Sequence, residues 1–271
     1  MSQGSAKATK QTRSTTVQSV VRAFNVLQAF FEEGTDLSVT EVATRINLAP
    51  ATVHRLLATL VMSGWIEQDR RSLRYELSAK VLARSAMALA SSRLLRDSQQ
   101  FLVQLSEATG LNSFLTAPIP QGSVLLAKQQ GRLGPAAEFQ VGKVHPLHAS
   151  ATGKLFLAYL PYTEWWDGYG RGGELGRLTA NTIVDPIRLR RELEAIRERG
   201  YSVDHDELHD SYRSIAVPVR NAHADVIAAL SCSGWASELP EDFEQMLLHE
   251  LVPAARELSS SLDDYLISKS S

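Results

Sequence analysis

Two short helices joined by a tight turn constrain the fold of this chain more than any other feature. Ser38 and Glu41 form a capping box, in which each side chain satisfies a free backbone N–H group at the start of a helix. This helix is expected to end near Ile46, and Asn47 tolerates the left-handed backbone that a tight turn requires. Pro50 fits the first turn of the next helix, where its missing N–H group removes no hydrogen bond. The succession predicts a helix-turn-helix.

The second helix of this pair has one apolar side and one polar side. The apolar side is expected to face the core and consists of Val53, Leu56, Leu57, Leu60 and Val61. Thr52, His54 and Arg55 then face outward near the start of the helix. In a helix-turn-helix, side chains at this position reach base edges in the major groove of DNA. These three residues are therefore candidate DNA contacts, and a solvated surface role is the alternative for each.

A basic hairpin is predicted directly after the helix-turn-helix. Apolar residues alternate on both sides of a short turn and are Trp65, Leu73, Tyr75 and Leu77. Arg70, Arg71 and Arg74 lie in or beside this turn and are expected to bind phosphate, which adds affinity and little sequence information. A helix-turn-helix followed by such a hairpin is a winged helix, so the sequence predicts a winged-helix domain over residues 16–78.

A longer helix is predicted before the helix-turn-helix. Its apolar residues recur every three or four positions and predict one broad apolar face, made of Val17, Val20, Val21, Phe24, Leu27, Phe30 and Phe31. Arg22 lies on the same helix and is a further candidate DNA contact, with a solvent-facing role as the alternative. Residues 1–15 are basic and rich in Ser and Thr, which predicts a disordered arm.

Length and charge indicate two modules of opposite character. The chain has 271 residues, of which 44% are hydrophobic, and this length fits two domains. Residues 1–90 contain 11 basic and 7 acidic side chains, a net charge of +4, whereas the remaining residues contain 17 and 23, a net charge of −6. A positive module of this size suits a polyanion such as nucleic acid.

Membrane and disulfide-stabilised classes are excluded by composition. No run approaches the roughly 18–20 apolar residues that a membrane-spanning helix requires, and no apolar segment follows the N-terminal lysines as in a signal peptide. We therefore expect no membrane partner and a cytoplasmic location. The single cysteine, Cys232, excludes an internal disulfide framework and a cysteine-rich metal site, and it is expected to be a buried, inert thiol.

Three segments of the chain together resemble one known protein family. They are "VQSVVRAFNVLQAFFEEGTDLSVTEVATRINLAPATVHRLLATLVMSGWIEQDRRSLRYELSAKVLARS", "HPLHASATGKLFLAYLP" and "GYSVDHDELHDSYRSIAVPVRNAHADVIAALSCSG". In this order they resemble the IclR family of bacterial transcription regulators, and the similarity covers nearly all of the chain after its first 15 residues. Two departures lie in the reader helix and its turn, where Asn47 and Ala51 replace the glycine and serine of many relatives.

The resemblance implies an α+β architecture. It implies a winged helix-turn-helix, a linker helix over residues 79–93, and an effector-binding domain over residues 94–271 with a GAF-like antiparallel sheet and packed helices. The residue pattern predicts strands at 112–119, 123–130, 214–221 and 225–234, and helices at 94–108, 151–160, 186–200 and 242–266. The resemblance further implies double-stranded operator DNA and a small organic or aromatic acid as partners, a homodimer or dimer of dimers, and no cofactor.

A ligand pocket is expected in the second domain. Ser231 and Ser233 share one face of a predicted strand, and their hydroxyls would orient a small polar ligand if that face is buried. The alternative is that they are surface serines on an edge strand. Ala151, Thr152 and Gly153 lie at a helix start, where free N–H groups and the helix dipole favour a carboxylate.

The resemblance carries the pocket onto seven positions of this chain. They are Ala151, Thr152, Asp204, Tyr212, Ser214, Ser231 and Ser233. Ser214 stands where many relatives have cysteine, and Tyr212 where they have a smaller aliphatic residue. These two residues narrow the cavity and add hydroxyl groups, so the ligand is expected to differ from those best known in the family.

Two enzyme-like motifs fail on inspection. "SATGKL" resembles a phosphate-binding loop, but that loop requires Gly where His148 stands and Ser or Thr where Leu155 stands. His205 and His209 are four residues apart as in the zinc motif H-E-x-x-H, but Asp206 occupies the Glu position and no helix is expected here. His145 and His148 are expected to form hydrogen bonds in a loop. We predict no catalytic and no metal-binding residues.

Three functional hypotheses therefore remain open. The favoured one is a ligand-responsive DNA-binding regulator. The second is a winged-helix nucleic-acid-binding protein that has no small-molecule effector. The third is a metal-dependent hydrolase that uses His205 and His209.

Overall fold

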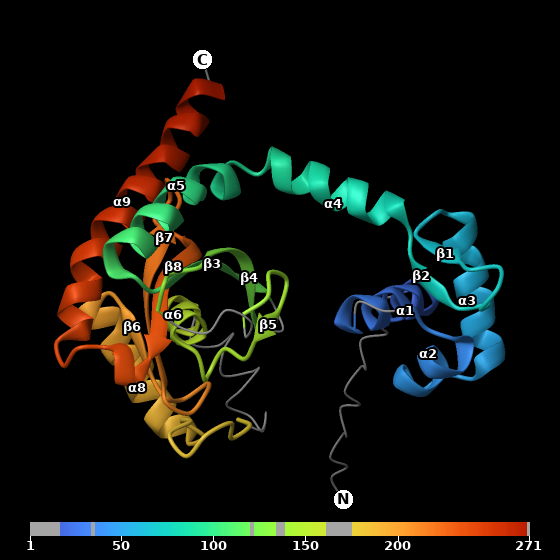
Figure 1. The fold of residues 1–271 in the computed structure, drawn as a ribbon, viewed down its shortest axis with the longest axis horizontal. Helices are drawn as coiled ribbons and strands as arrows, with labels where there is room; N and C mark the ends of the chain where they lie inside the picture. Colours follow the sequence, from blue (N-terminus) through green and yellow to red (C-terminus); the bar gives the residue numbers. More distant parts are fainter. Residues whose placement is uncertain (1–16, 34–35, 120–121, 134–138, 161–174, 270–271) are drawn as a thin grey trace, which may run out of the picture. The chain divides into compact units, whose positions relative to one another are not determined.

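The computed structural model describes residues 17–33, 36–119, 122–133, 139–160 and 175–269. The chain divides into two compact units, Met1–Leu89 and Ala90–Ser271 (Figure 1). The predicted arm over residues 1–15 lies outside the described residues. None of the helices in the described part combines the length and the apolar content needed to cross a bilayer.

The first unit contains the predicted winged helix. Its elements are α1 (Gln18–Glu33), α2 (Val39–Arg45), α3 (Pro50–Met62), β1 (Ile66–Gln68) and β2 (Tyr75–Leu77). Both hydrogen bonds of the capping box form, because the Glu41 N–H group donates to Ser38 Oγ at 3.3 Å and the Ser38 N–H group donates to Glu41 Oε2 at 2.7 Å. Asn47 has a φ of 50°, as the tight turn between α2 and α3 requires. The helix-turn-helix and its antiparallel hairpin are confirmed.

The apolar face predicted for the first helix is wrong in most positions. Leu27 and Phe30 are buried, and they pack with Val26 and Ala29 against the inner side of α3. The other five predicted residues are 41–65% exposed and are Val17, Val20, Val21, Phe24 and Phe31. The helix carries apolar residues around most of its circumference, and the small core of this unit covers only one side of it. Helix α1 therefore presents a second, uncovered apolar face.

Two smaller expectations for this unit also require correction. Val61 is 37% exposed and Leu56 is half-buried, so the inner face of α3 is narrower than predicted and is formed by Val53, Leu57 and Leu60. Leu73 lies in the hairpin turn with a φ of 58° and an exposed side chain, and it does not belong to a strand.

The second unit is an antiparallel sheet with helices on both faces, which confirms the predicted α+β class (Figure 1). Six strands run in the order β5-β4-β3-β8-β7-β6. They are β3 (Asn112–Ile119), β4 (Gly122–Gln129), β5 (Val144–His145), β6 (Ser202–His205), β7 (Tyr212–Arg220) and β8 (Val226–Trp235). The strands β5 and β6 were not predicted, because two and four residues are too few for a recognisable alternation.

Each face of this sheet has its own core. On one face, α5 (Arg93–Thr109) and α9 (Phe243–Lys269) bury Leu230 and Cys232 of β8. On the other face, α6 (Ala151–Tyr159) and α8 (Pro186–Arg199) pack over Ala229. Burial raises the pKa of the Cys232 thiol to about 12, so this cysteine is buried and protonated at neutral pH as expected.

The helix α4 (Ala79–Ser91) spans the boundary between the two units, which falls after Leu89. Only Val81 of this helix is buried, whereas Leu82, Met87 and Leu89 are exposed. The helix ends before Ser92, whose hydroxyl caps the start of α5 by accepting from the Leu95 N–H group.

The start of α6 is fixed by a close approach of two backbones. Gly153 lies in the first turn of α6, and a Cβ atom added there would be 2.4 Å from the carbonyl oxygen of Leu147 and 2.5 Å from its Cα atom. Any side chain at this position would push α6 away from the segment that precedes it. The glycine therefore determines how closely the N-terminus of α6 approaches the backbone at Leu147.

We expect Gly153→Ala to lower the free energy of unfolding by about 1–3 kcal/mol, because the added methyl group overlaps the Leu147 backbone. In the interior of an ordinary helix, replacing Gly by Ala raises the free energy of unfolding by as much as about 1 kcal/mol. Urea denaturation measures the difference. Gly176→Ala is the matched control, since no atom lies within 4 Å of the added Cβ there. A Gly153→Ala variant as stable as the original protein would contradict the argument.

Candidate functional site

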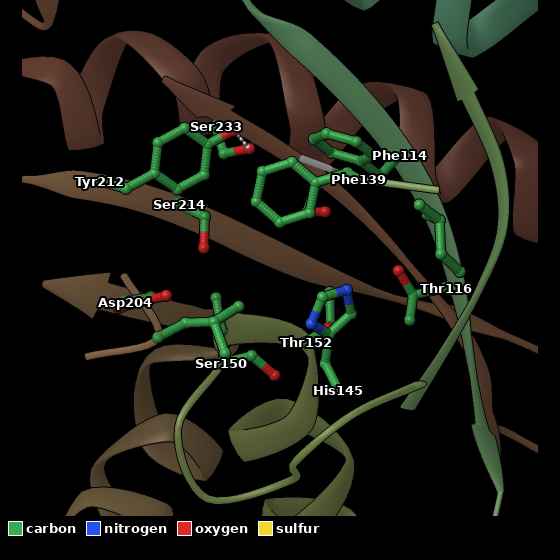
Figure 2. Close-up of a pocket in the computed structure, with 14 residues that line it drawn as sticks. Phe114, Thr116, Phe139, His145, Ser150, Thr152, Asp204, Tyr212, Ser214 and Ser233 are labelled. Atoms are coloured by element: carbon green, nitrogen blue, oxygen red, sulfur yellow. Dashed lines mark hydrogen bonds between the residues drawn. The ribbon is translucent and has the colours of Figure 1, made fainter. Parts of the chain in front are cut away.

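A small pocket lies between the N-terminus of α6 and one face of the sheet (Figure 2). It brings together all seven residues that the sequence assigned to an effector site, which are Ala151, Thr152, Asp204, Tyr212, Ser214, Ser231 and Ser233. The remaining lining residues are Phe114, Thr116, Leu125, Phe139, His145, Ser150 and Leu208. The free volume is about 40 Å³.

The register of the sheet places the polar residues of the pocket in one row. Asp204 of β6 is opposite Ser214 of β7, and Ser214 is opposite Ser233 of β8. Residues directly opposite one another in an antiparallel pair share a face of the sheet. The row therefore crosses three strands and faces α6.

The two serines of β8 share a buried face, as predicted. Ser231 and Ser233 are 4% and 3% exposed, while Leu230 and Cys232 belong to the core on the opposite face. The alternative of surface serines on an edge strand is wrong, because β8 is hydrogen-bonded to β3 on one side and to β7 on the other.

The first turn of α6 presents backbone donors to the pocket. The Ser150 hydroxyl accepts a hydrogen bond from the Gly153 N–H group at 3.1 Å, and the Lys154 N–H group donates to the Ser150 carbonyl oxygen. The N–H groups of Ala151 and Thr152 belong to the first turn, where a helix supplies no acceptor of its own. Together with the helix dipole they favour an anionic group at this end of the pocket.

Asp204 is the only acidic residue among the described residues that line the pocket. Burial, reinforced by the nearby Glu207 carboxylate, raises the pKa of Asp204 to about 7, against the opposing effects of a hydrogen bond from the Glu207 N–H group (2.7 Å) and the charge of Lys154. Near neutral pH a large fraction of Asp204 is therefore protonated. A protonated carboxyl group donates a hydrogen bond to an anion that an ionised one would repel.

An ion pair behind the pocket holds this arrangement. Lys154 of α6 is almost completely buried, and its Nζ atom donates to Glu207 Oε1. Glu192 Oε1 of α8 lies 3.9 Å from the same Nζ atom. The lysine of the "SATGKL" motif is therefore paired inside the protein, unlike the lysine of a phosphate-binding loop.

Aromatic residues form the opposite end of the pocket. Tyr212 stacks on Phe139 with ring centroids 5.1 Å apart, and Phe114 lies 5.3 Å from Phe139. The Tyr212 hydroxyl forms a hydrogen bond of 2.7 Å with Ser233 Oγ. The sequence did not identify the two phenylalanines as pocket residues. Phe114 is in the pocket because the strand register places it opposite Ser231, and this register could not be read from the sequence. Phe139 lies outside any helix or strand, so no residue pattern places it.

The two histidines that were expected in a loop behave differently, and His145 instead belongs to strand β5. His148 Nε2 forms the expected hydrogen bond with the Gly176 carbonyl oxygen at 2.9 Å. His145 lines the pocket, and its Nε2 atom has no hydrogen-bond partner among the described residues, contrary to expectation. Burial, with smaller effects of Lys143 and His209, lowers the pKa of His145 to about 4, so the ring is neutral at pH 7.

Within the described residues no group of three or more His, Cys, Asp or Glu side chains could hold a metal ion. His205 is the last residue of β6, and its Nε2 atom lies 3.5 Å from Glu244 Oε1. His209 lies edge-on to Phe139 at 5.9 Å. The segment between the two histidines is a turn and not a helix, as expected, so it lacks the geometry of the zinc motif.

The candidate DNA contacts lie on the first unit. His54 and Arg55 of α3 are exposed, and Thr52 is half-buried. Thr52, Arg55 and Arg22 line a groove of about 810 Å³ between α1 and α3. The exposed face of α3 is therefore accessible, as a reader helix requires.

The three arginines of the hairpin fall into two groups. Arg70 and Arg71 are exposed at the turn. Arg74 instead forms ion pairs with Asp36 at 2.7 Å and with Glu41 at 2.9 Å, and these contacts connect the hairpin to the start of α2. The predicted phosphate role suits Arg70 and Arg71 better than Arg74, whose charge is already paired.

Two family models match the chain. The model described as the IclR helix-turn-helix domain matches residues 19–70, and the model described as the C-terminal domain of the bacterial transcriptional regulator IclR matches residues 86–260. The second match alone covers more than half of the chain.

Individual proteins and structures agree with the family models. The Escherichia coli transcriptional regulator XynR is 31% identical over 246 residues, which are 91% of this chain and 97% of that protein. The p-hydroxybenzoate hydroxylase transcriptional activator of Acinetobacter baylyi is 29% identical over 255 residues, 91% of this chain and 90% of that protein. The crystal structure of an IclR transcriptional regulator from Alicyclobacillus acidocaldarius has a TM-score of 0.79 at 27% identity and covers 90% of this chain and 98% of that chain.

The raised pKa of Asp204 predicts a pH-dependent stability. The folded protein holds the Asp204 proton up to about pH 7, whereas the unfolded chain releases it near pH 3.8, so the free energy of unfolding falls as the pH rises between these values. We expect Asp204→Asn to remove this fall. The melting temperature of the variant, relative to that of the original protein, should therefore increase from pH 5 to pH 8. Asp210→Asn, at an exposed position, is the control, and parallel pH profiles for Asp204→Asn and the original protein would contradict the assignment.

Proposed function

Because the chain belongs to the IclR family of bacterial transcriptional regulators, we propose that it binds operator DNA in the cytoplasm and controls a catabolic operon in response to a small organic or aromatic acid. The relatives that it matches are transcriptional regulators and not enzymes, so the hydrolase hypothesis is set aside. The observation that supports the ligand response best is the convergence of all seven expected effector residues on one buried pocket.

The DNA-binding role is supported by the exposed polar side of α3. Arg55 and His54 are exposed there, and an arginine can form two hydrogen bonds to the edge of a guanine. Arg70 and Arg71 at the hairpin tip would contact phosphate groups beside the groove. We therefore assign base reading to α3, with Thr52 as its least accessible member, and we assign positioning on the duplex to the hairpin.

We expect Arg55→Ala to weaken binding to the specific operator by about 1–3 kcal/mol and to relax sequence preference at one base pair. The operator is first selected from a random pool of duplexes with the original protein, and affinities are then measured by fluorescence anisotropy. Arg191→Ala, at an exposed arginine of α8, is the control. Unchanged operator affinity for Arg55→Ala would remove this residue from the reading surface.

We propose a homodimer as the DNA-binding form, with a dimer of dimers as its extension. A protein that reads a palindromic site requires two reader helices related by a twofold axis. The uncovered apolar face of α1 supports self-association, because four large apolar side chains on this helix, and Val17 directly before it, are costly to leave in water. Its most exposed aromatic residue is Phe24, at 65%.

We expect Phe24→Asp to weaken dimer formation by about tenfold or more, which corresponds to roughly 1.4 kcal/mol. Analytical ultracentrifugation at micromolar concentration measures the dissociation constant of the dimer. Met62→Asp is the control, because Met62 is an apolar residue outside the α1 face that is 89% exposed. Equal dissociation constants for Phe24→Asp and the original protein would show that the α1 face does not contribute.

The proposed response to the acid is a linkage between two binding events. An acid that binds one arrangement of the protein better than another changes DNA affinity by that difference, typically about 1–3 kcal/mol. The second candidate, a winged-helix protein without an effector, is favoured only if no acid binds. A thermal-shift screen of organic and aromatic acids, followed by operator titration with each acid that binds, distinguishes the two. An acid that binds and shifts operator affinity supports the proposal, and a screen without any binding acid supports the second candidate.

A further inference from the structure

The pocket of the second unit has two chemically different ends, which Figure 2 shows facing each other. Ser150, Thr152, Asp204 and His145 form the polar end beside the start of α6. Tyr212, together with Phe114 and Phe139, forms the aromatic end on the sheet side. A ligand must place its charged group at the first end and fit its remaining atoms into the space before the second.

Tyr212 is held in place on three sides. Its ring stacks on Phe139 at 5.1 Å and meets Trp235, its cross-strand partner, edge-on at 5.5 Å. Its hydroxyl is hydrogen-bonded to Ser233 Oγ, and the residue is only 2% exposed. Rotation of the side chain would break the stacking and would separate two buried hydroxyl groups, so the ring acts as a fixed wall.

The wall determines how much space is left. The free volume of about 40 Å³ compares with roughly 10–15 Å³ for a single water molecule, so the pocket has room for about three to four groups of that size. Sites that enclose drug-sized ligands measure about 300–1,000 Å³. A space of this size suits an acid with a short carbon chain better than an aromatic ring with its carboxylate.

The polar end is built for an acid with a second polar group. No Lys or Arg is among the described lining residues, so the carboxylate would bind to the free N–H groups in the first turn of α6 and to protonated Asp204. His145 is 9% exposed, and its Nε2 atom is buried without a partner in the described part of the chain. An unpartnered buried nitrogen is costly, and a hydroxyl or oxo group on the ligand would satisfy it.

We propose that Tyr212 is the residue that determines effector size and that it restricts the effector to short aliphatic hydroxy or oxo acids, to the exclusion of aromatic acids. This inference rests on the proposed function and selects between its two ligand classes. A single side chain, fixed by Phe139, Trp235 and Ser233, occupies the space that a larger ligand would require.

The test compares short and aromatic acids on three forms of the full chain. The probes are glycolate, lactate, pyruvate and 4-hydroxybenzoate, and isothermal titration calorimetry measures each dissociation constant. Tyr212→Leu removes the ring and opens the aromatic end. Tyr212→Phe is the matched control, because it keeps the ring and removes only the hydroxyl that contacts Ser233. Melting curves establish that each variant is folded.

The expected result is that the original protein binds at least one short acid at least tenfold more tightly than 4-hydroxybenzoate. Tyr212→Phe should keep this preference, whereas Tyr212→Leu should gain at least tenfold in affinity for 4-hydroxybenzoate. The comparison on the original protein decides the matter even if Tyr212→Leu fails to fold.

Two results would overturn the inference. One is 4-hydroxybenzoate binding to the original protein as tightly as the best short acid. The other is a folded Tyr212→Leu variant with no gain for 4-hydroxybenzoate. Operator binding, measured on the same samples, distinguishes failure of this inference from failure of the proposed function. A chain that does not bind the selected duplex DNA would refute the proposed regulatory function itself.

Discussion

The buried ion pair between Lys154 and Glu207 is the interaction on which the ligand pocket depends. Two charges withdrawn from water are costly, and loss of one partner from such a pair typically costs about 3–5 kcal/mol because the other is left uncompensated. The pair connects the first turn of α6 to the turn after β6. Asp204 precedes that turn and accepts a hydrogen bond from the Glu207 N–H group, so the same contact positions the acid of the pocket beside the helix start.

Electrostatics and packing both favour the binding of an anion at this site. The close approach at Gly153 packs the α6 N-terminus against the backbone at Leu147, and burial raises the pKa of Asp204 to about 7, so a large fraction of it is protonated near neutral pH. A pocket whose described lining contains no lysine or arginine thus acquires donors from a helix end and from a neutral carboxyl group. Donors of this kind bind an anion more weakly than an arginine would, which suits the proposed reversible binding of a small acid.

Much of this architecture can be predicted from the sequence, because local rules determine it. The capping box at Ser38 and the left-handed Asn47 fix the helix-turn-helix without reference to the rest of the chain. The long strands β3 and β8 are predicted from their residue pattern, and the two serines of β8 share a face because side chains alternate along a strand. Among the seven pocket residues, the residue pattern also indicated Ser231, Ser233, Ala151 and Thr152. Asp204, Tyr212 and Ser214 followed from family resemblance alone.

The features that escaped prediction depend on tertiary structure. Periodicity shows that α1 is apolar on a broad face, but only the size of the core decides that Phe30 is covered and Phe24 is not. Arg74 looks like a phosphate ligand until Asp36 and Glu41 are seen beside it. His145 belongs to the pocket because β5 pairs with β4, and a strand of two residues is too short for alternation to reveal it.

The central position of β8 in the sheet has a consequence for how such proteins diversify. Its backbone is bonded on both sides, so the floor of the pocket cannot shift without breaking the sheet, and new chemistry must arise through side chains. The residues proposed to face the ligand and those proposed to face the duplex lie in separate compact units with separate cores. If the proposed roles hold, one copy can after gene duplication acquire a new effector while it keeps its operator, or the reverse, through a few substitutions in one unit.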